Sequence, residues 1–250
     1  MIDRNALNIR ILIHVAKRLG NLREKVVFVG GCATGLLITD PAMPEVRSTQ
    51  DVDVIVEVAS RLVYNRLEKE LRSRGFRQAM SENAPVCRWL VDDIKVDVMP
   101  TKEDILGFAN RWYLPAIRNA DHAEIGKELT IQLATPPYFL ATKIEAFKGR
   151  GGGDYITSHD IEDIITIVDG RPEVVSEITT SSDDLKDYLS ESFRALLANG
   201  EFLEAIPGIC YPIAPVRRGC RDSGNVLSKY QLCKYCMSEH YAFCNLKNLF

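Results

Sequence analysis

Residues 27–58 read VFVGGCATGLLITDPAMPEVRSTQDVDVIVEV. They predict a buried strand that ends at the glycine pair Gly30-Gly31, then a short helix and a proline-containing loop, and then a second strand that begins at Asp51. Because side chains alternate between the two faces of a strand, Asp51 and Asp53 lie side by side on one face, while the valines around them fill the other. The stretch therefore predicts a pair of neighbouring carboxylates on an otherwise apolar strand.

This pair of carboxylates indicates a bound cation. Two unpaired carboxylates at close range repel each other and raise each other's pKa, and a cation between them removes that repulsion. Hard divalent ions such as Mg²⁺ prefer carboxylate oxygen, and the glycines before the strand let the backbone approach phosphate. We therefore expect a site for a metal ion and a nucleotide.

A third carboxylate, Asp97, stands in the alternating run Lys95–Met99. If this run forms a strand beside the one that begins at Asp51, Asp97 joins Asp51 and Asp53 on one surface. Three carboxylates can hold two Mg²⁺ ions, with Mn²⁺ as an alternative, and two such ions clamp the attacking and leaving oxygens of a phosphoryl transfer. Near the attacking hydroxyl, Asp97 can also accept its proton.

The pattern of apolar residues divides the chain into three parts. Residues 1–135 mix strand and helix signals, which is typical of an α/β (α+β) domain with a mixed sheet flanked by helices. Residues 136–209 carry only helix signals and predict a helical domain. Residues 210–250 contain six Lys and Arg against two Asp and Glu, and five of the seven cysteines, and predict a basic, cysteine-rich, poorly ordered tail.

The same pattern predicts the elements of the first two parts. We expect strands at residues 26–29, 51–58, 86–91, 94–99 and 129–133, with a hairpin turn at Asp92-Asp93. We expect helices at residues 3–20, 33–38, 60–74, 136–150, 158–170, 172–180 and 183–199. Residues 102–125 give weaker signals and predict short helices.

The composition narrows the class of protein. The chain is 46% apolar and 26% charged, as is typical of globular proteins, and its net charge of −3 argues against strong general affinity for nucleic acid. It contains no run of eighteen apolar residues, and its first residues lack the basic and then apolar form of a signal peptide. We therefore expect a cytoplasmic protein with no membrane partner.

The tail has a loose zinc-ligand spacing at Cys233, Cys236, His240 and Cys244. The strict pattern of two cysteine pairs is missing, because Cys220 has no near partner. We expect a poorly packed segment here; a zinc site, or a non-native end from an altered reading frame, is the alternative.

Taken in order, these motifs resemble the polymerase-β-type nucleotidyltransferase superfamily. The resemblance lies in the glycine turn, the run Arg47-Ser48-Thr49-Gln50-Asp51-Val52-Asp53 and the later Asp97. The form Arg-x-Thr-x-Asp-x-Asp is similar to that of the AbiEii-type nucleotidyltransferase toxins of bacterial toxin–antitoxin systems, whose helical lysine motif and later acidic motif are matched at Lys143 and at Asp160 and Asp163. The likeness covers about residues 25–170 and departs at Gly31-Cys32, where the family usually has a serine.

This resemblance implies a nucleotidyltransferase-like sheet and the transfer of an NMP from an NTP to a hydroxyl group, with release of pyrophosphate. It implies that Asp51, Asp53 and Asp97 hold Mg²⁺ and, with Lys143 and Asp163, are catalytic. The residues expected to bind the nucleotide are Gly30, Gly31, Arg47, Ser48, Thr49, Lys143, Arg150 and Asp160. The implied partners are an NTP, a tRNA or protein acceptor, and a cognate antitoxin.

Physical reasons support the later motifs. Lys143 and Arg150 lie seven residues apart on one expected helix, so they share a face and can neutralise a triphosphate. Asp160 and Asp163 are neighbours on the next helix, and they can orient Lys143 or Arg150 through a charge-assisted hydrogen bond or contact the ribose or base.

Two other functions compete with this one. A nucleotidyltransferase that modifies a cationic antibiotic, of the aminoglycoside or lincosamide kind, would need an acidic pocket. The acids that could contribute to it are Glu82, Asp92, Asp93, Glu103 and Asp104. A nucleotide-binding or antitoxin-binding module without turnover is the other alternative, and the missing serine of the glycine motif supports it.

Overall fold

The computed structural model describes residues 4–43, 45–82, 84–126, 129–150 and 153–209. Two compact units are present: the first unit comprises residues 1–37 and 45–145, and the second unit residues 38–44 and 146–250, as far as these are described. The division between Glu145 and Ala146 falls inside a helix. The domain limits expected at 135 and 209 stay predictions, and the expected tail at 210–250 lies outside the described residues.

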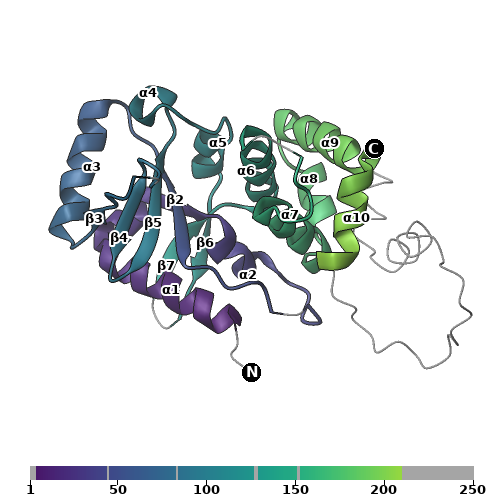
Figure 1. Ribbon diagram of the computed structural model, residues 1–250, viewed down its shortest axis with the longest axis horizontal. Helices are drawn as coiled ribbons and strands as arrows, with labels where there is room; N and C mark the ends of the chain where they lie inside the picture. The colour runs from purple at the N-terminus through teal and green to yellow at the C-terminus, as the bar shows by residue number, and fades with distance from the viewer. Residues whose placement is uncertain (1–3, 44, 83, 127–128, 151–152, 210–250) are drawn as a thin grey trace, which may run out of the picture. The chain divides into compact units, whose positions relative to one another are not determined.

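A seven-stranded mixed sheet forms the centre of the first unit (Figure 1), in the order β3-β4-β5-β2-β1-β7-β6. Neighbouring strands run parallel in the pairs β2–β5 and β1–β7 and antiparallel in the other pairs. The strands are β1 (Val26–Val29), β2 (Asp51–Val56), β3 (Arg77–Gln78), β4 (Arg88–Val91), β5 (Ile94–Pro100), β6 (Asp121–Glu124) and β7 (Thr130–Leu133).

In the first unit, α1 (Arg4–Leu19) and α3 (Arg61–Ser73) are long helices, and α2 (Thr34–Leu37), α4 (Glu103–Leu106) and α5 (Tyr113–Arg118) are short. The 3₁₀ turns are η1 (Gly20–Lys25) and η2 (Gly31–Ala33). On α1, Leu12, Val15, Ala16 and Leu19 recur at helical spacing and are at most 1% exposed, so this face packs against η2, β2 and β5. The apolar spacing in the sequence predicts this helix correctly.

From Pro136 to Ile209 the described residues form helices and no strand. The helices are α6 (Pro136–Gly149), which continues from the first unit into the second, α7 (His159–Gly170), α8 (Val174–Thr179), α9 (Asp183–Ala198) and α10 (Gly200–Ile209). On α7, Ile161, Ile164, Ile165 and Val168 are fully buried and form its core-facing stripe. In the part of the chain described, none of the helices is at once long enough and apolar enough to cross a membrane.

The mixed α/β class is confirmed, and so are the strands expected around β1, β2, β7 and the β4–β5 hairpin, with small shifts in their ends. One prediction is wrong in part. Residues 102–125 contain the helices α4 and α5, but they end in the strand β6 rather than in a further helix. The two-residue strand β3 and the helix α10 were not predicted.

Candidate functional site

Three carboxylates meet on one face of the sheet in the first unit. β2 and β5 are parallel neighbours, and their register pairs Asp53 with Asp97 and Asp51 with Lys95. Residues paired in this way project from the same face, and neighbouring strands lie about 4.8 Å apart. Asp97 is buried, whereas Asp51 and Asp53 are half-buried. We call Asp51, Asp53 and Asp97 the carboxylate cluster; its assembly confirms the expected strand pairing, while the metal-binding role of its members stays a prediction.

Gly30 lies directly against this cluster. It follows β1, whose Val29 is paired with Asp53, and it has a φ of +76°, which a residue with a side chain rarely adopts. A Cβ at this position would lie 1.9 Å from Asp53 Oδ2. Only glycine therefore lets the Asp53 carboxylate pack on the backbone at the end of β1. Gly31 continues into η2 and is buried.

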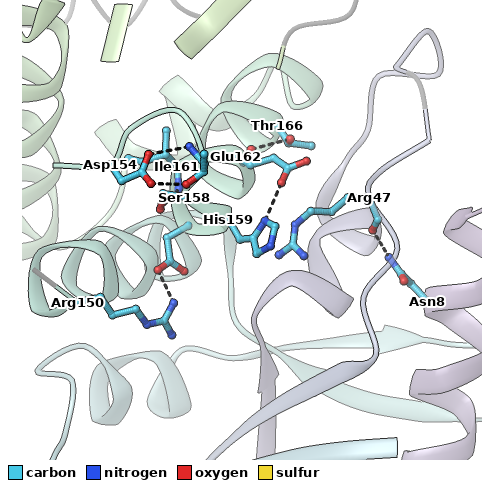
Figure 2. A network of polar contacts seen from close by, with 11 residues as sticks. Asn8, Arg47, Arg150, Asp154, Ser158, His159, Ile161, Glu162 and Thr166 are labelled. Carbon is cyan, nitrogen blue, oxygen red and sulfur yellow. Dashed lines mark hydrogen bonds and ion pairs between the residues drawn. The ribbon is translucent and has the colours of Figure 1, made fainter. Parts of the chain in front are cut away.

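The segment that leads into β2 is fixed by α1. The buried Asn8 donates from Nδ2 to the Arg47 carbonyl at 2.9 Å (Figure 2), and its Oδ1 accepts from the Thr49 N–H at 3.1 Å. Thr49 Oγ1 in turn accepts from the Asp51 N–H at 3.3 Å. Asn8 thus positions the expected nucleotide-binding residues Arg47 and Thr49, and Ser48 between them is exposed. The sequence held no signal for this role of Asn8.

Cys32 takes no exposed position in the glycine turn. Its side chain is buried, and the Sγ atom lies 3.5 Å from the Asn8 carbonyl, to which the thiol donates. Burial, together with the charges of Asp53 and Asp51 and against a lowering effect of Arg47, raises the pKa of the thiol to about 12. Cys32 is therefore a neutral core residue at physiological pH.

Two cations from the sheet contact the carboxylate cluster. Arg88 on β4 stands opposite Asp97; its Nε and Nη2 donate to the two carboxylate oxygens at 2.8 and 2.7 Å, and Nη2 lies 3.5 Å from Asp51 Oδ2. Lys95 Nζ lies 3.6 Å from Asp51 Oδ1. The hydrogen bonds to Asp97 raise the pKa of Arg88 above its usual value, although desolvation opposes this. Neither cation was predicted from the sequence.

The donor chemistry of the cluster fits a hard divalent ion, since three carboxylates share one face and Gly30 leaves the approach to Asp53 free of a side chain. Across the described ranges, however, no group of three or more His, Cys, Asp or Glu residues is arranged to hold a metal ion. Arg88 and Lys95 contact two of the three carboxylates, Asp51 and Asp97.

Lys143 belongs to the first unit and lies on α6. It is only 9% exposed, and its ammonium group is 5.8 Å from the ring centroid of Phe139. A lysine is seldom buried without a compensating partner. Lys143 is therefore a buried residue of α6 and does not lie on the surface.

The remaining predicted residues belong to the second unit. Arg150, labelled in Figure 2, donates from Nη1 to Asp160 Oδ2 at 2.6 Å, which is one of the charge-assisted pairs that the sequence left open. The Asp160 side chain is 4% exposed and the Arg150 side chain 73%. Asp163, one turn further along α7, is buried. The structure therefore joins Arg150 with Asp160 in this unit, and Asp51, Asp53, Asp97 and Gly30 in the first unit.

Four of the five acids that could form an antibiotic-binding pocket fall into two separate pairs. Asp92 and Asp93 form the turn before β5, where Asp92 binds Arg18 and His14, whereas Glu103 and Asp104 follow the other end of β5. Seven residues of strand separate the two pairs, which is about 20 Å.

No family model and no curated protein matches the chain. The likeness to nucleotidyltransferases therefore depends on the residues of the glycine turn and the carboxylate cluster and on their arrangement.

Proposed function

We propose that this protein is a metal-dependent nucleotidyltransferase that moves an NMP from an NTP to a hydroxyl acceptor and releases pyrophosphate. The register of β2 and β5 carries this proposal, because it aligns Asp53 with Asp97 and leaves Asp51 on the same face. The contact between Asp53 and Gly30 adds support, because it joins the acids to a bare stretch of backbone that phosphate can approach.

Each residue has a defined task in this proposal. The carboxylate cluster would hold the divalent ions, which supply charge neutralisation and alignment for phosphoryl transfer. Asp97 would accept the proton of the attacking hydroxyl. Asn8 keeps Arg47 and Thr49 in place beside the start of β2. Lys143, in the same unit, would neutralise charge on the triphosphate. The roles expected for Arg150, Asp160 and Asp163, which belong to the second unit, stay predictions.

The acceptor that we propose first is a tRNA or a protein, in a toxin–antitoxin setting. This choice depends on the resemblance of the Arg47–Asp53 segment to the AbiEii-type toxins. The separation of the acids at the two ends of β5 argues against an acidic pocket for a cationic antibiotic.

A specific observation favours a second candidate, a nucleotide-binding or antitoxin-binding module without turnover. Arg88 and Lys95 already neutralise part of the carboxylate cluster, and a protein that never binds a metal ion needs such neutralisation permanently.

The test measures transfer of label from each α-³²P NTP, with Mg²⁺ or Mn²⁺, into total tRNA, the protein itself, or aminoglycosides and lincosamides. We expect label in tRNA or protein, and we expect Asp53→Asn to reduce the transfer by about a hundredfold or more, because the ion loses a ligand. Asp93→Asn is the matched control, since it makes the same change at an exposed turn of the same sheet.

Three other results would count against this proposal. Transfer that persists in Asp53→Asn contradicts the assigned site. Label only in an antibiotic identifies the other class of acceptor. Binding of NTP without transfer to any acceptor supports the module without turnover.

A further inference from the structure

Arg88 makes close cationic contacts with two members of the carboxylate cluster, Asp51 and Asp97. Its guanidinium group donates to both oxygens of Asp97 and reaches Asp51 with the same Nη2 atom. The side chain is 21% exposed and that of Asp97 is 12% exposed, so the pair is largely shielded from water. The planar fork of arginine matches a carboxylate in this way, whereas an ammonium group does not.

These contacts use the oxygens that a divalent ion would need. An ion held by Asp51 and Asp97 would bind oxygens that now accept hydrogen bonds from Arg88, and it would place like charges within a few ångströms of each other. Charges that are partly buried interact more strongly than charges in water. The ion and the guanidinium group therefore exclude each other from Asp97.

We propose that Arg88 is the resident cation of this site and that it exchanges with the divalent ion. It neutralises Asp51 and Asp97 when no ion is bound, and it leaves Asp97 when an ion binds. The ion must displace Arg88 from Asp97, and the free energy that this displacement costs lowers the affinity for the ion. Arg88 therefore sets the ion concentration at which the site fills. The inference rests on the proposed metal site and adds to it a residue that opposes ion binding.

Lys95 cannot replace Arg88 in this role. Within the described residues, Asp51 is the member of the cluster that it contacts, at 3.6 Å, and its side chain is 44% exposed. The exposed Arg77 on the neighbouring strand β3 is a useful comparison, because its loss changes the net charge by the same amount.

The test measures Mn²⁺ binding to the full chain at pH 7.5, from the electron paramagnetic resonance signal of the free ion. We expect Arg88→Gln to bind Mn²⁺ about tenfold or more tightly than the wild type, because no guanidinium group has to be displaced. Arg77→Gln should leave the affinity unchanged. Arg88→Lys, which keeps the charge without the fork, should lie between wild type and Arg88→Gln.

A second substitution locates the effect. In the double variant Arg88→Gln with Asp97→Asn, the gain in affinity should disappear, because the ligand that Arg88 releases is gone. Far-UV circular dichroism checks that each variant is folded. If Arg88→Gln does not fold, Arg88→Lys still shows whether loss of the guanidinium group raises the affinity for Mn²⁺.

The outcomes separate this inference from the proposed function. Equal Mn²⁺ affinity in wild type, Arg88→Gln and Arg88→Lys overturns the role of Arg88 and leaves the metal site intact. No Mn²⁺ binding in any variant overturns both. Tighter binding by Arg77→Gln as well means that net charge, rather than the exchange, controls the affinity.

Discussion

Gly30 and Asp53 show at the scale of single residues how closely backbone and side chain fit in this site. Gly30 combines a positive φ with a neighbour that fills the place of a side chain. Gly107 has a similar φ of +82°, but no atom lies within 4 Å of the position that its Cβ would take. The ψ angles differ, however: Gly107 has a ψ of 7°, in the left-handed region, whereas Gly30 has a ψ of −179°, in a region open essentially to glycine alone. Gly30 therefore combines a more restricted backbone conformation with the steric clash.

We predict that Gly107→Ala lowers the free energy of unfolding by about 1 kcal/mol, the usual cost of a left-handed conformation. Gly30→Ala should cost about 2 kcal/mol more, because its backbone conformation is open essentially to glycine alone and because Asp53 must also move. Urea denaturation of the two variants measures the difference. Equal losses would mean that Asp53 gives way freely and that the contact does not fix the carboxylate.

The sequence reveals these residues to different degrees. The alternation around Asp51 and Asp97 predicts which face they share, since strand geometry is local and regular. Arg88 was missed but can be found, because counting outward from the turn at Asp92-Asp93 places it opposite Asp97. Asn8 cannot be found in this way. Its partners in the chain are 39 and 41 positions away, and only the packing of α1 brings them together.

At the scale of elements, two helices of the second unit offer a comparison of helix caps. The Ser158 side chain accepts a hydrogen bond from the Ile161 N–H at the start of α7, at 3.4 Å. Ser182 holds the same position before α9 but makes no such bond.

We predict that Ser158→Ala lowers the free energy of unfolding by about 1 kcal/mol, since the backbone N–H loses its acceptor. Ser182→Ala should change it by only a few tenths of a kcal/mol, because no cap bond is lost. Denaturation followed by far-UV circular dichroism, which reports the helices, gives both values. A larger loss for Ser182→Ala would contradict this account of the caps.

The strand β6 shows why some strands cannot be predicted from the sequence alone. Its residues, Asp121–Glu124, are mostly exposed and include no β-branched or aromatic side chain. Nothing local favours a strand there, and pairing with β7 provides its hydrogen bonds. The predicted strands β1, β2 and β5 instead owe their signal to valines that the core buries.

For the molecule as a whole, the buried thiols make stability depend on alkaline pH. Burial raises the pKa of Cys32 and of Cys87 to about 12, from a usual value of 9.0. The unfolded chain therefore loses these protons near pH 9, while the folded chain keeps them. The unfolded state then binds fewer protons, so the stabilisation that is complete below pH 9 is lost as pH rises toward 12.

We predict that the urea midpoint falls between pH 8 and pH 11. Tryptophan fluorescence follows the unfolding of the first unit, because both tryptophans of the chain, Trp89 and Trp112, belong to it. The double variant Cys32→Ala with Cys87→Ala should show a shallower pH dependence than the wild type, although it is less stable at pH 7. An equal slope in both proteins would show that other groups control the alkaline limit.

The two edge strands of the sheet affect how readily the protein aggregates in a crowded solution. An open sheet invites further strands, from another copy or an unfolded chain, wherever its last strand is long and apolar. Here the last strands are β3, with two residues, and β6, with four residues that are mostly charged or exposed. The polar residues of β6 leave no strand signal in the sequence. The same residues discourage aggregation through this edge of the sheet.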